Sequence, residues 1–436
     1  METVIRPENE MKNSGVEWVE YIPKNWNCIP LKRYFQFGKG LPITKADLTE
    51  TGEKVISYGQ IHAKFNTGVS VNDRLIRFVS DKYKLTNANS LCSKGDIILA
   101  DTSEDKEGCG NAVYIDCDEK IFAGYHTIIL KSTKNNKYLA YLFQSDSWRN
   151  QIRTRVNGVK LFSITQKILN QCTIILPPLS EQQIIADYLD EKCSKIDDII
   201  AEANASVEEY KELKQAVIDN ATMTGIHDSE MKDTDYVWFP EMPKSWDLVL
   251  ASLLFREDVR PVNANDVSLS LSQVDGLIPT DDMSERSLKS ATHDNWKHVI
   301  PDDLVLNRFK GHLGVFFASK YTGMVSFHYG VYHAIRDDVY AKYYEYLFHS
   351  TTYKNIFALK SNGITVGLQN LSNGNFYSVK ILHPTLDEQI EIVKYLDKRT
   401  AEIDSLIAEK ESLIKDLESY KKSLIYEVVT GKRRVV

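Results

Sequence analysis

Residues 18–26 read WVEYIPKNW, and the chain repeats this segment at residues 238–246 as WFPEMPKSW. Both tryptophans, the proline at the sixth position and the lysine after it keep their places. Four further motifs recur in the same order, which a fixed-order repeat explains and chance does not. They are YLAYLFQS at 138–145 and YYEYLFHS at 343–350, LSEQ at 179–182 and LDEQ at 386–389, YLD at 188–190 and 395–397, and TG at 224–225 and 430–431. The sequence therefore predicts two versions of one unit.

Each copy divides into a globular part and a helical part. Residues 1–176 and 226–382 hold short apolar runs broken by Gly, Asn and Asp, a pattern typical of short strands, with helices expected around 136–156 and 340–360. Residues 177–225 and 383–436 hold almost no Gly or Pro after their opening prolines, which predicts one long helix in each. We therefore expect an α+β fold in which two mixed α/β domains are separated by two helical segments.

Apolar residues in both helical segments recur every seven positions over three to four heptads, which favours a coiled coil. A helix packed on a globular core is the alternative, and such a helix usually carries a broader apolar stripe. Because both copies carry the seam, we expect the helices to pair as an antiparallel coiled coil, with a pseudo-two-fold axis between the copies. The predicted seam residues are Leu189, Ile196, Ile199, Tyr210 and Leu213 in the first helix and Leu396, Ile403, Leu406, Leu413 and Leu417 in the second.

The composition is that of an ordinary soluble protein of 436 residues, with 43% hydrophobic and 26% charged residues. No apolar run reaches the ~18 residues that a membrane span needs. The first fifteen residues lack the apolar core of a secretory signal, so we expect a cytoplasmic protein. The six cysteines never form a C-x-x-C pair, so we expect neither a zinc site nor a disulfide framework.

The net charge of −7 is unevenly distributed along the chain. Residues 1–176 hold 24 basic and 19 acidic residues, a net charge of +5, whereas residues 177–225 hold 4 basic and 11 acidic residues. The first helical segment is therefore better suited to a protein partner than to DNA phosphates. A basic cluster at 148–160, which ends in a Gly turn, has a less charged counterpart at 353–365. Such clusters bind phosphates readily, although a solvated helix face would look the same.

Catalytic motifs are missing from the sequence. It contains no phosphate-binding G-x-x-x-x-G-K-[ST] loop, no N-P-P-[YF] methyltransferase signature, no H-E-x-x-H and no G-x-S-x-G. His126 and His333 both follow a tyrosine and match across the repeat. A structural histidine beside a strand explains this match better than a catalytic one. We therefore expect no catalytic residues in this chain.

Two variable globular parts, each led by W-x-x-x-x-P-x-x-W and followed by a helix with L-x-E-Q that ends near T-G, resemble the specificity (S) subunits of Type I restriction-modification systems. The resemblance covers essentially the whole chain, and the first copy departs from it in having one residue more before Gly225 than the second has before Gly431. The residues that carry the resemblance are Trp18, Pro23, Trp26, Pro178, Leu179, Glu181, Gln182, Ile196, Asp197 and Gly225, with Trp238, Pro243, Trp246, Pro384, Leu386, Glu388, Gln389, Ile403, Asp404, Thr430 and Gly431.

The resemblance implies target recognition domains at 1–176 and 226–382, each reading half of a bipartite asymmetric DNA target. The helical segments at 177–225 and 383–436 would set the spacer and dock two modification subunits, which methylate adenine N6 with S-adenosylmethionine. Restriction subunits, which use ATP and Mg²⁺ for cleavage, would join them. This chain would hold no cofactor and no metal. The alternative is a non-enzymatic, bivalent coiled-coil scaffold that binds protein or carbohydrate, which the acidic balance favours slightly.

Base readout needs polar side chains on loops that enter the major groove, and phosphate contacts need Lys, Arg and loop amides. The candidates for DNA binding in the first domain are Lys39, Thr44, Lys45, Tyr58, Gln60, Arg153, Arg155 and Lys160. The candidates in the second domain are Ser272, Gln273, Arg308, Lys310, His312, Lys360 and Thr365.

Overall fold

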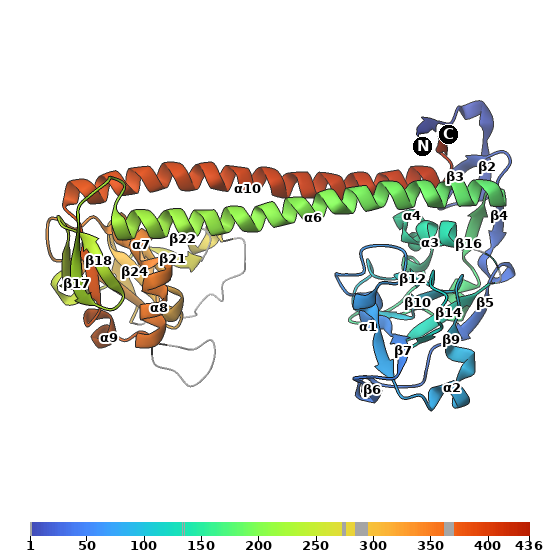
Figure 1. Cartoon of the computed structure of the whole chain (residues 1–436), viewed down its shortest axis with the longest axis horizontal. Coiled ribbons are helices and arrows are strands. Elements are labelled where there is room, and N and C mark those ends of the chain that lie inside the picture. Colours follow the sequence, from blue (N-terminus) through green and yellow to red (C-terminus); the bar gives the residue numbers. More distant parts are fainter. Residues whose placement is uncertain (1, 133, 135, 273–275, 284–294, 362–369) are drawn as a thin grey trace. The chain divides into compact units, whose positions relative to one another are not determined.

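The computed structural model describes residues 2–132, 134, 136–272, 276–283, 295–361 and 370–436. The chain forms two compact units (Figure 1): unit 1 comprises Met1–Ala203 with Ser412–Val436, and unit 2 comprises Asn204–Glu411. Two long helices, α6 (Leu179–Thr224) and α10 (Leu386–Val429), each contribute one part to each unit. Each long helix is therefore divided between the two units.

Unit 1 contains two main sheets built from short strands. One sheet has the order β12-β10-β14-β5, formed by Ala112–Tyr114, Ile97–Ala100, Thr127–Lys131 and Gln36–Lys39. The other has the order β6-β8-β7-β13-β9, formed by Leu48–Thr49, Arg77–Val79, Glu53–Ile56, Ile121–Ala123 and Leu91–Cys92. The remaining elements are the strand pairs β1 (Thr3–Ile5) with β29 (Arg433–Val435), β2 (Met11–Val16) with β3 (Val19–Pro23), β4 (Asn27–Pro30) with β16 (Thr173–Leu176) and β11 (Thr102–Ser103) with β15 (Phe162–Ser163), and the short helices α1 (Tyr58–Ile61), α2 (Tyr83–Thr86) and α5 (Gln166–Leu169).

Unit 2 repeats this arrangement. Its sheet β20-β27-β24-β25, formed by Phe255–Glu257, Tyr329–Ala334, Leu304–Asn307 and Phe316–Ala318, has the strand order of β5-β14-β10-β12. Its second sheet, β22-β21-β26-β23, consists of Gly276–Pro279, Val267–Ser272, Gly323–Val325 and Lys297–Val299. The pairs β17 (Met231–Tyr236) with β18 (Phe239–Pro243) and β19 (Asp247–Leu250) with β28 (Lys380–His383), and the helix α9 (Asn373–Tyr377), complete the unit. The predicted α+β fold with an internal repeat is confirmed.

The helix expected around 136–156 is two helices, α3 (Lys137–Gln144) and α4 (Asp146–Arg153). Its counterpart around 340–360 is likewise divided into α7 (Ala341–Phe348) and α8 (Thr351–Lys360). A serine causes each division, because Ser145 and Ser350 adopt extended backbone and their hydroxyls accept the N–H of Trp148 and Tyr353. Serine is a preferred N-cap because its side chain satisfies an N–H that the helix leaves free.

The repeated motifs of the sequence contact one another within each unit. The indole N–H of Trp26 donates to Glu181 at 2.9 Å, and that of Trp246 donates to Glu388 at 3.2 Å. The glycine that follows each long helix has positive φ, +82° at Gly225 and +74° at Gly431, and lies against the tryptophan of its unit. The leader of unit 1 thus packs on the end of α10, and the leader of unit 2 packs on the end of α6. The W-x-x-x-x-P-x-x-W, E-Q and T-G motifs recur because together they make one joint.

Buried residues of α6 follow a 3–4 spacing and share a hydrophobic core cluster with residues of α10 in each unit. Asp197 of α6 pairs with Lys421 of α10 at 2.6 Å, and Lys214 of α6 pairs with Asp404 of α10 at 2.7 Å. As the paired residue on α6 advances from 197 to 214, its partner on α10 recedes from 421 to 404. The helices are therefore antiparallel, as predicted (Figure 1). Among the described residues, no helix is both long enough and apolar enough to cross a membrane.

The predicted seam needs a correction at its second position. Leu189, Ile196, Leu396 and Ile403 are buried, and Tyr210 and Leu417 are partly buried. Four other predicted seam residues do not belong to the buried row. Each lies three positions after the first seam position of its heptad, whereas the helices bury the residue four positions after it. They are Ile199, Leu213, Leu406 and Leu413, which are 40–46% exposed. Buried fourth positions include Cys193 and Val207 on α6 and Thr400 and Val428 on α10.

Candidate nucleic-acid interface

Two of the predicted DNA-binding segments of unit 1 meet at the turn between β13 and β14. The end of β5 reaches this turn through Gly40, whose N–H donates to Thr127. A Cβ at Gly40 would lie 1.9 Å from the carbonyl oxygen of Gly124, and a Cβ at Gly124 would lie 2.0 Å from the hydroxyl of Ser57. Only glycine allows three backbones to approach this closely. The packing brings the segments of Lys39 and Tyr58 to one place, with Lys39 exposed.

The turn presents an aromatic cluster. The ring of Tyr58 lies 5.6 Å from Tyr125 and 5.3 Å from His126. Burial, with the neighbouring Tyr58, raises the pKa of the Tyr125 hydroxyl. The imidazole of His126 lies 3.5 Å from the Asp101 carboxylate and 3.4 Å from the Thr102 hydroxyl. A cavity of about 540 Å³ lies beside the cluster, lined by Tyr58, Gly59, His62, Ser103, Glu104, Asp105, Glu107, Gly108 and Asn111.

Two other candidates in unit 1 use part of their side chains to cap helices. The amide oxygen of Gln60 accepts the N–H of Ser57 at the start of α1. The hydroxyl of Thr44 donates to Asp47 at 3.0 Å in a short 3-10 turn. Lys45 and Lys160 are exposed. The two lysines therefore offer their charge to solvent, whereas Thr44 and Gln60 have structural roles.

The arginines of the basic cluster at 148–160 are engaged by their own unit, although Arg155 and Lys160 are exposed. Arg149 is half-buried, and loss of hydration together with the neighbouring Arg153 lowers its pKa to about 10. Arg153 is bound by Asp146 at 2.9 Å and by the carbonyl oxygen of Glu107 at 2.6 Å, with 19% of its side chain exposed. Arg155 donates to the carbonyl oxygen of Gln151 at 2.5 Å. The charge pattern alone did not reveal these partners.

In unit 2, Arg308 belongs to a half-buried polar network. It donates to Glu257 at 2.6 Å and to Asn373 at 2.8 Å, and Lys297 donates to the same Glu257 carboxylate at 2.7 Å. Although burial opposes it, hydrogen bonds from Lys297 and Asn373 and the charge of Arg308 hold the pKa of Glu257 below its ordinary value. The Tyr332 hydroxyl completes the network by donating to Asn373 at 2.9 Å. The network holds the Arg308 head at the end of β24.

The other candidates of unit 2 are distributed over its loops. Ser272 ends β21, Lys310 is exposed, and the amine of Lys360 lies 3.1 Å from the Ser378 hydroxyl. The backbone of His312 lies in the 3-10 turn Gly311–Leu313. Gln273 and Thr365 lie outside the described residues.

The strand pairing corrects the match between histidines. Ile97 of β10 pairs with Leu130 of β14, and the equivalent Leu304 of β24 pairs with Tyr332 of β27. Leu130 therefore corresponds to Tyr332, which makes His328, not His333, the counterpart of His126. The repeated Tyr-His dipeptide suggested the wrong match. Aligning the apolar strand residues would have revealed the Phe327-His328 dipeptide as the equivalent of Tyr125-His126.

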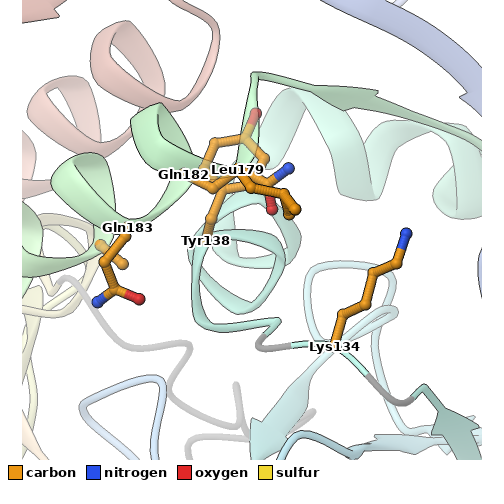
Figure 2. A pocket seen from close by; sticks show the side chains of 6 residues that line it. Lys134, Tyr138, Leu179, Gln182 and Gln183 are labelled. Atoms are coloured by element: carbon orange, nitrogen blue, oxygen red, sulfur yellow. The ribbon is translucent and has the colours of Figure 1, made fainter.

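A second cavity, of about 290 Å³, lies at the start of α6. Figure 2 shows Leu179, Gln182 and Gln183 on the first turns of α6, beside Tyr138 of α3 and Lys134. The amide of Gln182 donates to the carbonyl oxygen of Pro177 at 2.9 Å, as Gln389 does to Pro384. The cavity contains none of the predicted DNA-binding residues. Among the described residues, no group of three or more His, Cys, Asp or Glu side chains is arranged to hold a metal ion.

Comparison with known proteins identifies the family. The sequence model of the Type I restriction modification DNA specificity domain matches residues 23–209 and 279–416, the larger part of the chain. The specificity subunit of the type I restriction enzyme EcoKI from Escherichia coli K12 is 21% identical over 364 residues, which cover 80% of this chain and 77% of that protein. The StySPI specificity subunit from Salmonella potsdam is 20% identical over 365 residues, with the same coverage.

Solved structures share the fold. A chain from “Structural basis underlying complex assembly and conformational transition of the type I R-M system” superposes with a TM-score of 0.67 at 15% identity, covering 94% of this chain and 99% of its own. The HsdS subunit from Thermoanaerobacter tengcongensis superposes with a TM-score of 0.50 at 14% identity, covering 94% and 98%. The family match and the repeated architecture together show that the chain belongs to the family of Type I restriction-modification DNA specificity subunits.

Proposed function

We propose that each unit reads one half of a bipartite, asymmetric DNA target, and that this chain supplies recognition only. The observation that supports this proposal is that the two units share one backbone fold but carry different side chains at equivalent positions. Both units have the same four-stranded order and the same tryptophan–glutamate joint, yet the end of β10 is followed by Asp101 and the end of β24 by Arg308. Different side chains on one scaffold suit the reading of two different half-sites.

The chemistry would belong to other subunits. Methylation of adenine N6 would come from two modification subunits that bind S-adenosylmethionine, and cleavage from restriction subunits that use ATP and Mg²⁺. This chain would be non-catalytic, hold no cofactor and work in the cytoplasm. Base methylation requires extrusion of the base into a pocket that also binds the cofactor, and the proposed division assigns that pocket to the modification subunits.

We assign docking of the modification subunits to apolar residues that the two helices leave exposed. Ile199 and Leu213 on α6 occupy the positions of Leu406 and Tyr420 on α10, and all four are at least 40% exposed. Exposed apolar residues in rows mark protein interfaces more often than scattered ones do. Because the row occurs twice, it provides two equivalent docking sites, which matches two copies of one partner.

The experiment for DNA reading uses the chain co-expressed with its cognate modification subunit. Genome-wide mapping of methylated adenines should give one bipartite, asymmetric motif, and retention of the complex on DNA should fall steeply with salt. The purified chain alone should show no methyl transfer, nuclease or ATPase activity. Methyl transfer by this chain without a second polypeptide, or a methylated motif with only one part, would contradict the proposal.

The docking assignment is tested by charge substitutions at equivalent exposed positions. Ile199→Asp and Leu406→Asp should each leave a complex with one modification subunit, and the double variant should bind none. Leu85→Asp, at a residue of α2 in unit 1 that is 91% exposed and lies on neither long helix, is the control and should leave two subunits bound. Mass photometry measures the stoichiometry, and two bound subunits in the double variant would refute the assignment.

A further inference from the structure

The turn between β13 and β14 in unit 1 and the turn between β26 and β27 in unit 2 have the same construction. Each is three residues long, Gly124-Tyr125-His126 in unit 1 and Ser326-Phe327-His328 in unit 2. The strands on both sides correspond as well, because β13 pairs parallel with β7 and β26 pairs parallel with β21. An aromatic residue followed by histidine therefore occupies one position of the fold in both units.

Both turns bring aromatic surface to solvent, but to different extents, because Tyr125 is half-buried against a core cluster that contains Phe122. Phe327 is 53% exposed, His328 is exposed, and the side chain of His126 is 57% exposed. The rings of Phe327 and His328 lie 3.8 Å apart. An exposed phenylalanine forgoes the stabilisation that its burial would give. A flat ring that is exposed in spite of this loss, with a second ring behind it, is suited to contact with a partner.

Each turn is also supported by the residue two positions after the neighbouring strand. Thr102, which follows β10, lies 3.4 Å from the His126 imidazole, and the ring of Phe309, which follows β24, lies 4.9 Å from that of His328. His126 has φ +55°, a left-handed conformation that is rare outside glycine, and its carbonyl accepts the N–H of Asp101 at 3.0 Å. His328 does not share this conformation, so the support from the neighbouring loop, and not the left-handed backbone, is what the two turns have in common.

The recurrence indicates what the turns contact. Side chains that differ between the units serve the two different half-sites, so a feature present in both serves what the half-sites have in common. On the proposed function, which this inference rests on, each half-site contains an adenine that must leave the base stack to be methylated. Extrusion opens a gap in the stack, and aromatic or apolar side chains stabilise unstacked DNA by filling such gaps.

We propose that Tyr125 and Phe327, each backed by the following histidine, fill the space in the base stack that the extruded adenine of their own half-site leaves. The ring takes over the stacking that the adenine loses, so the recognition subunit lowers the cost of extrusion while the modification subunit holds the base. Lys39, exposed at the end of β5, lies on the strand that pairs with β14 and favours DNA over a protein partner at this position.

The experiment uses the complex of this chain with its modification subunit and a duplex that carries the mapped target. Tyr125→Ala should lower methylation of one half-site by about 5- to 150-fold, which corresponds to the roughly 1–3 kcal/mol of base–aromatic stacking. Phe327→Ala should do the same at the other half-site. Tyr125→Phe and Phe327→Tyr keep the ring and should retain full activity, whereas Tyr125→Leu, which keeps apolar packing against Tyr58, should lose it.

Two readouts separate stacking from a general weakening. With 2-aminopurine in place of the target adenine, each Ala variant should show a smaller fluorescence increase at its own half-site. With an abasic position opposite the adenine, extrusion costs less, so the methylation defect should shrink. The controls Tyr21→Ala and Tyr321→Ala remove aromatic residues that are 48% and 41% exposed, and should have no effect.

Several results would overturn the inference: an equal defect on the abasic duplex, a defect at both half-sites from one substitution, loss of subunit assembly in the Tyr125 or Phe327 variants, or full activity of the Ala variants. Loss of assembly would assign the turns to the modification subunit instead of DNA. Failure of the proposed function has a different signature, because the unsubstituted complex would then show no sequence-specific methylation at all.

Discussion

At the scale of single residues, the same basic cluster holds a structural arginine and an exposed lysine. Arg153 binds Asp146 and the carbonyl oxygen of Glu107, whereas Lys160 is exposed. We expect Arg153→Ala to destabilise unit 1 by about 1–3 kcal/mol, because hydrogen bonds that involve charged groups are lost. Lys160→Ala should leave stability unchanged and lower the salt dependence of DNA binding by about 0.9 in log–log slope.

Urea unfolding and salt-dependent retention of the assembled complex measure the two effects. Each variant is the control for the other, since one removes an internal contact and the other an exposed charge. A reduced salt slope for Arg153→Ala with unchanged stability would show that Arg153 leaves its partners to bind phosphate.

His349 predicts how unit 2 responds to acid. Burial, with Lys354, Lys342 and Lys214 nearby, lowers its pKa to about 3 from an ordinary value of 6.5. The unfolded chain therefore binds a proton below pH 6.5 that the folded chain refuses, so stability falls as the pH drops from 6.5 towards 3. This one group accounts for about 2 kcal/mol between pH 7 and pH 5.

His349→Gln should therefore flatten the dependence of unfolding free energy on pH in this window. Urea unfolding at pH 7, 6 and 5 measures it, with His227→Gln as the control because the His227 side chain is 67% exposed. Equal slopes for the parent and His349→Gln would contradict a neutral, buried imidazole.

At the scale of elements, the joint at the start of each long helix contains a glutamate, and in unit 1 this glutamate is also part of a buried ion pair. Glu181 accepts from Trp26 and also pairs at 2.6 Å with Arg6, whose side chain is 6% exposed, whereas Glu388 accepts from Trp246 and Ser245. Glu181→Gln should destabilise the chain by about 2–4 kcal/mol, because it removes the closer of the two carboxylates that pair with the buried Arg6 and leaves only Glu10, at 3.7 Å.

Glu388→Gln is the matched substitution at the equivalent place and should cost about 1 kcal/mol, since it removes no buried ion pair. Urea unfolding of the two variants gives the comparison. A cost for Glu388→Gln as large as that for Glu181→Gln would show that the tryptophan bond, and not Arg6, dominates the joint.

The two helices also show which features the sequence could predict. Their existence, length and antiparallel pairing follow from the heptads and from the near absence of Gly and Pro. The second seam position could not be chosen in this way, because helix packing buries Cys193, Val207 and Thr400 and leaves Ile199 and Leu406 exposed. Partners outside this chain would favour apolar residues at those exposed positions, so hydrophobicity alone selected the wrong row.

The candidate site was predictable to a similar degree. Loops rich in Lys, Tyr and Gln were found, and two of these segments do meet at the turn that holds Tyr125 and His126. Contacts between distant segments could not be predicted, because Glu107 lies 46 residues from Arg153 and Glu257 lies 51 residues from Arg308 in the sequence. The equivalence of His126 with His328 depends on strand register, which no local motif specifies.

At the scale of the whole molecule, α6 and α10 make equivalent contacts in the two units, so we expect each helix to be able to take the place of the other. Tyr138 donates to the carbonyl oxygen of Val429 at the end of α10, and the equivalent Tyr343 donates to that of Thr222 at the end of α6. The ion pairs between helices are equivalent as well, with Asp197 facing Lys421 and Asp404 facing Lys214. A fragment of residues 1–226 keeps one recognition domain and α6, and it lacks α10.

The fragment should form a closed two-fold dimer in which the α6 of each copy covers the other. Without α10, the buried apolar residues of α6 would be exposed to water, which costs about 25 cal/mol per Å² of apolar surface. The α6 helix of a second copy is the nearest surface that could cover them. In this dimer Lys214 of each copy meets Asp197 of the other. Expressed with the modification subunit, the fragment should methylate an interrupted palindrome made from one half of the parental target, because target symmetry mirrors protein symmetry.

A charge exchange tests this arrangement directly. Lys214→Asp in the fragment should place four carboxylates at the two equivalent positions of the dimer and weaken association, because like charges meet there. Adding Asp197→Lys to the same fragment restores opposite charges at both positions and should restore the dimer. Analytical ultracentrifugation follows association, and methylation mapping follows the site. A folded fragment that stays monomeric, an asymmetric methylated site, or a double variant no better than Lys214→Asp alone would refute the interchange of α6 and α10.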